Sequence, residues 1–200
     1  MKEPIHVFRT HLPEPAVSYC YDLWQAHTFL FKITRSRQSK LGDYCYRLDQ
    51  GHQITVNHDL NPYAFLITYL HEVAHLLVFK QYVRRKAPHG KEWKAQFRQL
   101  LIPMMTETVF PKPILIALQL YVRNPTAATN SFGPLKEALK AFDPVDPNLI
   151  SLLQVAEGEA FVLGKRVFVK GELRRTRVVC TELRSGRKYT VLAKAMVKKV

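Results

Sequence analysis

Apolar residues follow two different periods along the first 122 residues of the chain. Residues 16–27 and 62–83 carry apolar side chains at helical spacing, and in the longer stretch these form one stripe, made of Leu66, Leu70, Val73 and Leu77. Short runs rich in β-branched and aromatic residues, bounded by polar turns, predict strands at 29–34, 43–48 and 53–57. Further helices are expected near 90–100, 114–122 and 135–142.

The pattern changes near residue 160. From there to the last residue, β-branched and aromatic runs are separated by Gly164, Gly171 and Gly186, which predicts about five short strands in a small barrel-like module. The preceding stretch contains the polar run NPTAATNSFGP and the helix-breaking DPVDP. We therefore expect an α+β chain with a domain at 1–123, a linker with a short helix at 124–159, and a β module at 160–200.

The sequence His71-Glu72-Val73-Ala74-His75 lies inside the longest predicted helix. Two histidines four residues apart project from one helical face, so that both imidazoles can reach one metal ion. Glu72, next to the first of them, is placed to act on water at the metal rather than to bind the metal itself. The spacing therefore predicts a metal site that carries its own general base.

A third histidine, His89, follows at the expected start of the next helix, in the run PHGKEW. Three protein ligands and one open position are what a catalytic zinc ion requires. His89 completes such a set with His71 and His75. The alternative is an ordinary histidine at the beginning of a helix.

Several motifs taken together resemble the SprT-like (Spartan-related) family of zinc metallopeptidase domains. They are HEVAH, then HGKEW, and upstream SRQSKLGDY and ITVNHDLNP, so that the resemblance covers about residues 15–110. It implies a zincin-like domain with a small antiparallel sheet, zinc bound by His71, His75 and His89, and Glu72 as general base. It also implies proteolysis of DNA-associated proteins, or a role linked to transcription elongation.

One part of the family pattern is missing. Many members end in a four-cysteine zinc ribbon, whereas this chain has only Cys180 beyond residue 45. A second zinc ion is therefore not expected, and one Zn²⁺ is the predicted cofactor.

Positive charge is in excess and is concentrated near the end of the chain. Thirty Lys and Arg face sixteen Asp and Glu, a formal net charge of +14, which favours a polyanionic partner such as DNA or another nucleic acid, bound without sequence preference. Solubility alone is the alternative explanation. The candidate contacts are Arg84, Arg85, Lys86, Arg174, Arg175, Arg177, Arg187 and Lys188.

The sequence gives no indication of a membrane or of secretion. Three widely spaced cysteines suit a reducing compartment, and the first residues lack the apolar core of a signal peptide. We expect a cytoplasmic protein, with association to the nucleoid as an option. The function expected is a zinc metalloendopeptidase that acts on DNA-associated proteins. The alternatives are a non-proteolytic nucleic-acid-binding or transcription-associated factor with a structural zinc site, and a β module that docks another protein.

Overall fold

The computed structural model describes residues 3–37, 39–82, 86–126, 132–144 and 148–200. The chain forms two compact units, Met1–Asp143 and Pro144–Val200. Each has its own buried apolar cluster. The division differs from the expected one, because the segment 124–159 contributes a helix to the first unit and a strand to the second.

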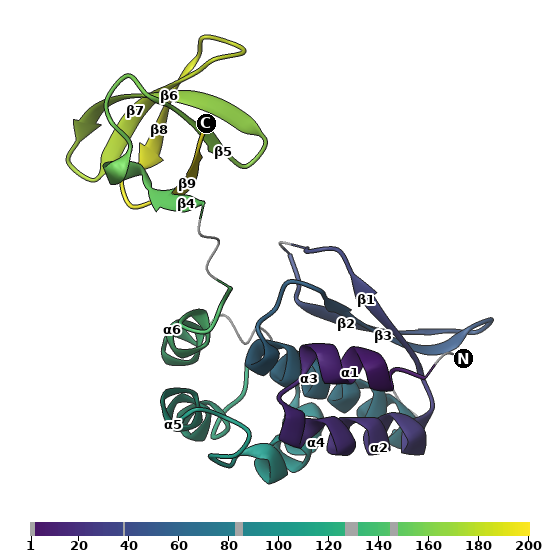
Figure 1. Ribbon diagram of the computed structural model, residues 1–200. Helices are drawn as coiled ribbons and strands as arrows, with labels where there is room; N and C mark the ends of the chain where they lie inside the picture. Colours follow the sequence, from purple (N-terminus) through teal and green to yellow (C-terminus); the bar gives the residue numbers. More distant parts are fainter. Residues whose placement is uncertain (1–2, 38, 83–85, 127–131, 145–147) are drawn as a thin grey trace. The chain divides into compact units, whose positions relative to one another are not determined.

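The first unit is a layer of helices beneath a three-stranded sheet (Figure 1). Strands β1 (Leu30–Thr34), β2 (Gly42–Arg47) and β3 (Gly51–Asn57) stand in the order β1-β3-β2. β2 and β3 form an antiparallel hairpin, whereas β1 runs parallel to β3. The expectation of an antiparallel sheet is therefore wrong for β1. β1 and β2 therefore flank β3 and run in opposite directions.

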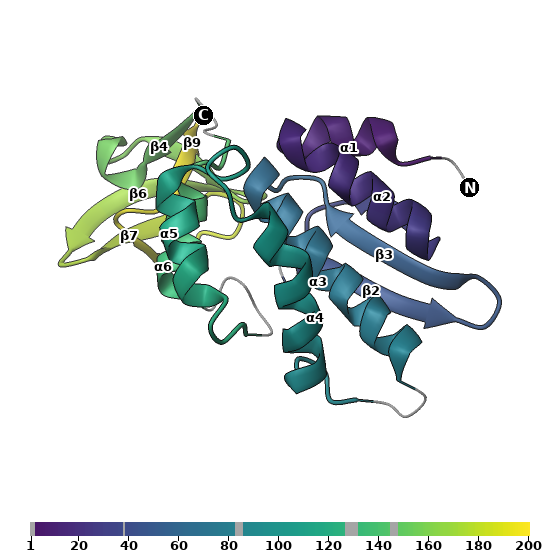
Figure 2. The same cartoon turned by 90° about the horizontal axis from the view of Figure 1, so that it is seen from below.

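The helices lie close to their predicted positions, except that α1 was not foreseen. The described α-helices of this unit are α1 (Ile5–His11), α2 (Val17–His27), α3 (Pro62–Gln81), α4 (Lys91–Leu101), α5 (Lys112–Tyr121) and α6 (Gly133–Lys140). Helix α3 packs against β2 and β3 and against α4, which Figure 2 shows beside it. The first apolar cluster includes residues from all six helices and from β3.

Helix α3 is the central helix of this unit. It is long and apolar enough to cross a membrane by length and composition, but 67% of its most apolar window is buried inside the protein, as expected of a core helix. Its start is fixed by Asn61, whose Oδ1 accepts the Ala64 N–H at 2.9 Å. The Asn61 amide also donates to the Leu139 carbonyl at 3.0 Å and to Asp143 Oδ1 at 2.7 Å, which ties α6 to α3.

The second unit is a six-stranded antiparallel sheet in the order β4-β9-β5-β6-β7-β8. Its strands are β4 (Leu149–Ser151), β5 (Ala160–Leu163), β6 (Arg166–Arg174), β7 (Arg177–Glu182), β8 (Lys188–Leu192) and β9 (Met196–Lys199). The five strands expected after residue 160 are present, and β4 is an addition. Among the described residues no pairing joins β4 to β8, so closure into a barrel remains a prediction.

Candidate metal centre

Three imidazoles converge where α3 faces the turn before α4. His71 and His75 stand one turn apart on α3, and His89 approaches them from the turn. The three Nε2 atoms are separated by 3.2 Å (His71 to His75), 3.1 Å (His71 to His89) and 3.0 Å (His75 to His89). Nitrogens spaced in this way can all lie about 2.0–2.1 Å from one common point, the usual zinc–nitrogen distance. The donor set therefore fits a single metal ion.

The backbone at His89 turns sharply to bring its ring to the other two. His89 has φ +60°, in the left-handed region that non-glycine residues rarely adopt. The turn is closed by the Gly90 N–H, which donates to the Ala87 carbonyl at 3.0 Å. Such a conformation costs on the order of 1 kcal/mol and persists where surrounding structure holds it, often at functional sites.

Trp93 forms the floor beneath the three imidazoles. Its ring centroid lies 4.5 Å from that of His71, 4.7 Å from His89 and 5.5 Å from His75. The indole N–H donates to the His71 carbonyl at 3.3 Å, and Phe97 stacks beneath the ring at 5.0 Å. Because Trp93 is almost fully buried, it fixes the ring positions from below. Its position as the last residue of the HGKEW motif did not by itself predict this role.

Burial keeps the three imidazoles neutral, which is the form that binds metal. It lowers the pKa of His71 to about 2, with smaller contributions from His75 and His89. It lowers the pKa of His75 to about 4, helped by His89 and opposed by Asp43. Burial also lowers the pKa of His89.

Glu72 lies beside this cluster and is only 7% exposed. Gly42 at the start of β2 makes room for it, since a Cβ on Gly42 would stand 2.6 Å from Glu72 Oε1 and 2.7 Å from Thr68 Cγ2. Burial, followed by the charge of Asp43, raises the pKa of Glu72 to about 8. The charges of Arg37 and Lys40 and a hydrogen bond from the Tyr44 N–H oppose this rise. The carboxyl is thus held where it can take up and release a proton near neutral pH.

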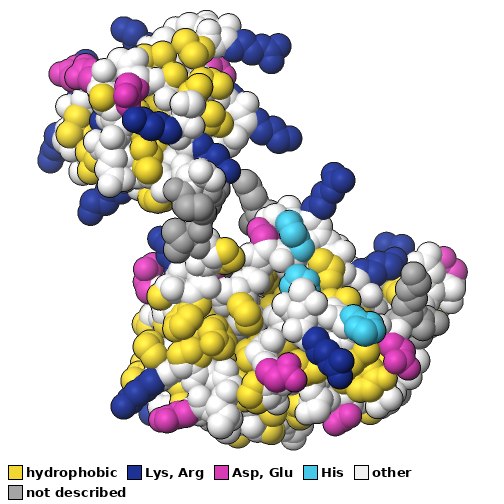
Figure 3. All heavy atoms as spheres, in the orientation of Figure 1, with side chains coloured by type: hydrophobic (Ala, Val, Ile, Leu, Met, Phe, Trp, Pro, Cys, Tyr) yellow, Lys and Arg dark blue, Asp and Glu magenta, His cyan; other side chains and the backbone are white. Residues whose placement is uncertain are grey.

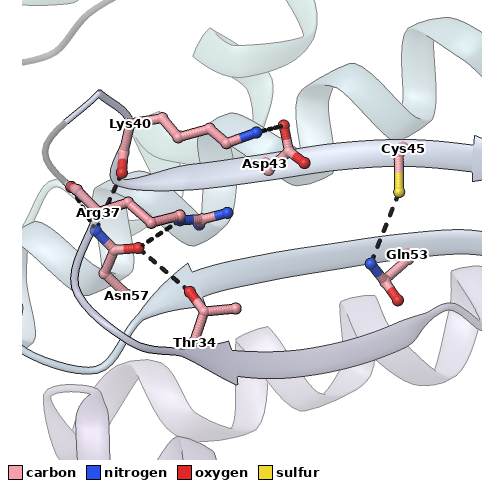
Figure 4. A network of polar contacts seen from close by, with 7 residues as sticks. All are labelled: Thr34, Arg37, Lys40, Asp43, Cys45, Gln53 and Asn57. Atoms are coloured by element: carbon pink, nitrogen blue, oxygen red, sulfur yellow. Dashed lines mark hydrogen bonds and ion pairs between the residues drawn. The ribbon is translucent and has the colours of Figure 1, made fainter.

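The basic loop between β1 and β2 is clamped by Asn57, the last residue of β3 (Figure 4). The Asn57 amide donates to the backbone carbonyls of Arg37 at 3.2 Å and Lys40 at 3.0 Å. Its Oδ1 accepts from Arg37 Nε at 2.8 Å. Lys40 in turn forms a 2.8 Å ion pair with Asp43. The SRQSKLGDY motif therefore places Gly42 against Glu72 and brings two cations close enough for their charges to act on its carboxylate, a role that its residue types alone did not reveal.

The predicted nucleic-acid contacts fall into two groups. In the first unit, Lys86 pairs with Glu92 at 3.5 Å and lies over the Tyr82 ring at 4.8 Å, while Arg84 and Arg85 lie outside the described residues. In the second unit, the exposed candidates are Arg174, Arg175, Arg177, Arg187 and Lys188. Figure 3 shows dark-blue cations projecting around the visible face of this unit and outnumbering the acidic side chains.

The aromatic residues of the second unit are core residues. Phe161 and Phe168 are buried and stack on each other at 5.7 Å, and Tyr189 is half-buried against Phe168. Arg166 covers the Tyr189 ring at 4.9 Å. These rings are therefore not free to stack on bases.

Comparison with known families agrees with this geometry. Residues 19–109 match the family model described as the SprT-like family. This segment is therefore similar to SprT-like domains. It spans β1, the basic loop, the β2–β3 hairpin, α3 and α4, and thus every residue of the candidate metal centre. No curated protein and no solved structure matches the chain.

The match confirms the resemblance inferred from the four motifs. SprT-like domains are zincin-like and are associated with metallopeptidase activity, and the mixed helix-and-sheet architecture of this unit agrees with that fold class. The second unit lies outside the matched segment, so its role has to be argued from its own residues.

Proposed function

We propose that this protein is a zinc-dependent metallopeptidase of the SprT-like type that acts on proteins associated with DNA. The observation that carries the proposal is the convergence of three Nε2 atoms within 3.2 Å of one another beside a buried carboxylate. His71, His75 and His89 would hold the ion. Bound there, zinc supplies a Lewis acid and lowers the pKa of a water molecule in its open position.

Glu72 acts as the general base and then as the general acid. Its carboxylate accepts a proton from the water that attacks the scissile carbonyl, and later delivers this proton to the leaving amine. Burial raises the pKa of Glu72 above the usual value of a carboxyl group, toward the range in which such a group can take up and give back a proton. A structural zinc site has no need of a carboxyl group buried beside its ligands, and this favours the peptidase over the non-proteolytic alternative.

Strand β2 offers an edge along which an extended substrate can bind. It stands at the end of the order β1-β3-β2 and pairs only with β3 among the described residues. Gly42 and Tyr44 of this strand contact Glu72, through close approach and a backbone hydrogen bond respectively. A peptide added to the free edge of β2 by backbone hydrogen bonds would therefore lie next to the general base.

The second unit supplies the attraction to nucleic acid. Arg174, Arg175 and Arg177 lie in and around the turn between β6 and β7, and all three are exposed. Exposed arginines on a small sheet neutralise phosphates without selecting a sequence. We propose that this unit brings the peptidase to proteins bound on DNA.

The test is cleavage of a basic DNA-binding protein by the purified, zinc-loaded chain, with and without single-stranded DNA, beside a chelator-treated control. The proposal expects cleavage that requires metal and increases when DNA holds enzyme and substrate together. Metal-dependent cleavage that DNA leaves unchanged would retain the peptidase and reject the DNA-associated substrate. Absence of cleavage in zinc-loaded protein would reject the peptidase.

A further inference from the structure

A cluster of aromatic rings stands at the end of the β2–β3 hairpin, against the last turns of α3. It consists of Tyr44 and Tyr46 on β2, His52 on β3 and Phe79 on α3, and we call it the aromatic corner. The ring centroid of Tyr46 lies 4.9 Å from that of Phe79 and 5.0 Å from that of His52, and the centroids of His52 and Phe79 are 5.6 Å apart. Tyr44 joins through a 3.0 Å hydrogen bond between its hydroxyl and His52 Nδ1.

The aromatic corner is unusual because large parts of its rings face solvent. Phe79 is 49% exposed and Tyr46 is 44% exposed, whereas the other aromatic rings of α3 are buried or half-buried. The contacts within the corner hold the rings in place, so that they are fixed and exposed together. Aromatic residues enriched on a surface in this way mark sites of recognition rather than of core packing.

The aromatic corner is also close to the candidate metal centre. Phe79 follows Glu72 by seven residues on α3, which puts both on the same helical face about 10 Å apart along the axis. Tyr44 connects the two places, because its backbone N–H bonds Glu72 and its ring belongs to the corner. A ligand on the corner would therefore lie beside a substrate on β2.

Positive charge lies beside these exposed rings. Lys80 follows Phe79 directly on α3, and its ammonium group donates to the His27 carbonyl. Its charge also acts on His52 of the corner. Flat apolar faces combined with positive charge complement a ligand that offers both flat rings and phosphates. Unstacked bases of a single-stranded nucleic acid have this chemistry.

We propose that the aromatic corner is a stacking site for one or two bases of single-stranded DNA or RNA, with Tyr46 and Phe79 as the platform and Lys80 as a phosphate contact. This inference rests on the nucleic-acid partner proposed above and assigns a second contact, in the SprT-like domain itself. It places the strand next to the β2 edge, so that a protein attached to or bound on unpaired nucleic acid is presented to Glu72.

The experiment separates stacking from phosphate binding in the full-length chain. Binding of an oligothymidylate of about twelve nucleotides is compared with binding of an abasic oligomer of equal length, using fluorescence anisotropy at one salt concentration. The abasic oligomer measures the phosphate contacts, and the ratio of the two affinities measures the contribution of the bases. One stacked base is expected to make this ratio at least about fivefold.

One double variant and a matched control decide the outcome. Replacing Tyr46 and Phe79 together by Leu, at exposed positions where the fold tolerates the change, is expected to bring the ratio close to one without changing the affinity for the abasic oligomer. Leu48→Ala, in the same hairpin and 94% exposed, is expected to leave the ratio unchanged. An oligomer with bromouracil should cross-link on irradiation to the tryptic peptides 41–47 or 48–80.

An unchanged ratio in the Leu double variant would overturn the inference, even if both oligomers bind tightly. A double variant that keeps the ratio but raises KM for a peptide substrate would overturn it in favour of a peptide subsite. Failure of the chain to bind either oligomer would instead overturn the nucleic-acid partner itself. A ratio that falls only in the double variant supports the stacking site whether or not cleavage is detected.

Discussion

Substituting Gly42 by Ala tests whether the position of Glu72 governs catalysis. The added Cβ would stand 2.6 Å from Glu72 Oε1, 2.8 Å from Glu72 Cγ and 2.7 Å from Thr68 Cγ2. Ordinary van der Waals contact begins near 3.4 Å, so the Glu72 side chain has to move by roughly 0.5–1 Å. Displacing a catalytic group by about 1 Å lowers the rate by up to about 100-fold. Overpacking of this kind costs about 1–3 kcal/mol of folding free energy.

The expected result is a fall in kcat of about 10- to 100-fold in the Gly42→Ala variant, with one zinc ion still bound because His71, His75 and His89 are not touched. Steady-state kinetics on an unstructured protein substrate, together with metal analysis, measure both quantities. Gly133→Ala is the matched control, since a Cβ there meets nothing within 4 Å. Adding Thr68→Ala to Gly42→Ala should recover part of the stability but not the rate. Wild-type kcat in folded Gly42→Ala protein would refute the reasoning.

Three further predictions concern stability and binding. Asn61→Ala removes the cap of α3 and the bonds from Asn61 to Leu139 of α6 and to Asp143. A loss of about 1–3 kcal/mol is expected in urea unfolding, and an unchanged midpoint would contradict the role of this cap. Burial and the nearby His58 lower the pKa of His11, so the contribution of this residue to folding stability is complete above pH 6.5 and is lost as the pH falls. The free energy of unfolding of His11→Gln should therefore depend less on acid pH than that of the wild type, and an equal dependence would contradict this. The third prediction concerns Arg174, Arg175 and Arg177. Replacing all three by Gln should reduce the slope of log affinity for DNA against log salt concentration by about two to three. An unchanged slope would show that they make no phosphate contacts.

Periodicity predicted the helices well because each buries one apolar stripe. The stripe from Leu66 to Leu77 predicted α3, and the spacing of His71 and His75 predicted two ligands on one face of that helix. His89 was predicted as the third histidine of the site, and the structure brings it to the other two. Its left-handed backbone was not predicted, since such strain is stabilised by the surrounding fold.

Features that depend on distant contacts were not predicted. The parallel pairing of β1 with β3 was missed because the pattern of a short strand does not specify its direction. The clamp from Asn57 to Arg37 joins residues 20 positions apart, and the bond from Trp93 to His71 joins residues 22 apart. Strand β4, three residues long, is too short to show a period.

The most direct test of the central claim is to compare Glu72→Gln with the wild type, both loaded with zinc, in metal analysis and in cleavage of an unstructured protein. Because Glu72 is not among the three nitrogen donors, we predict that the variant binds one zinc ion like the wild type and loses at least about 100-fold in cleavage rate. Equal cleavage by the two zinc-loaded proteins would contradict the assignment of Glu72 and, with it, the account of this centre as a peptidase site.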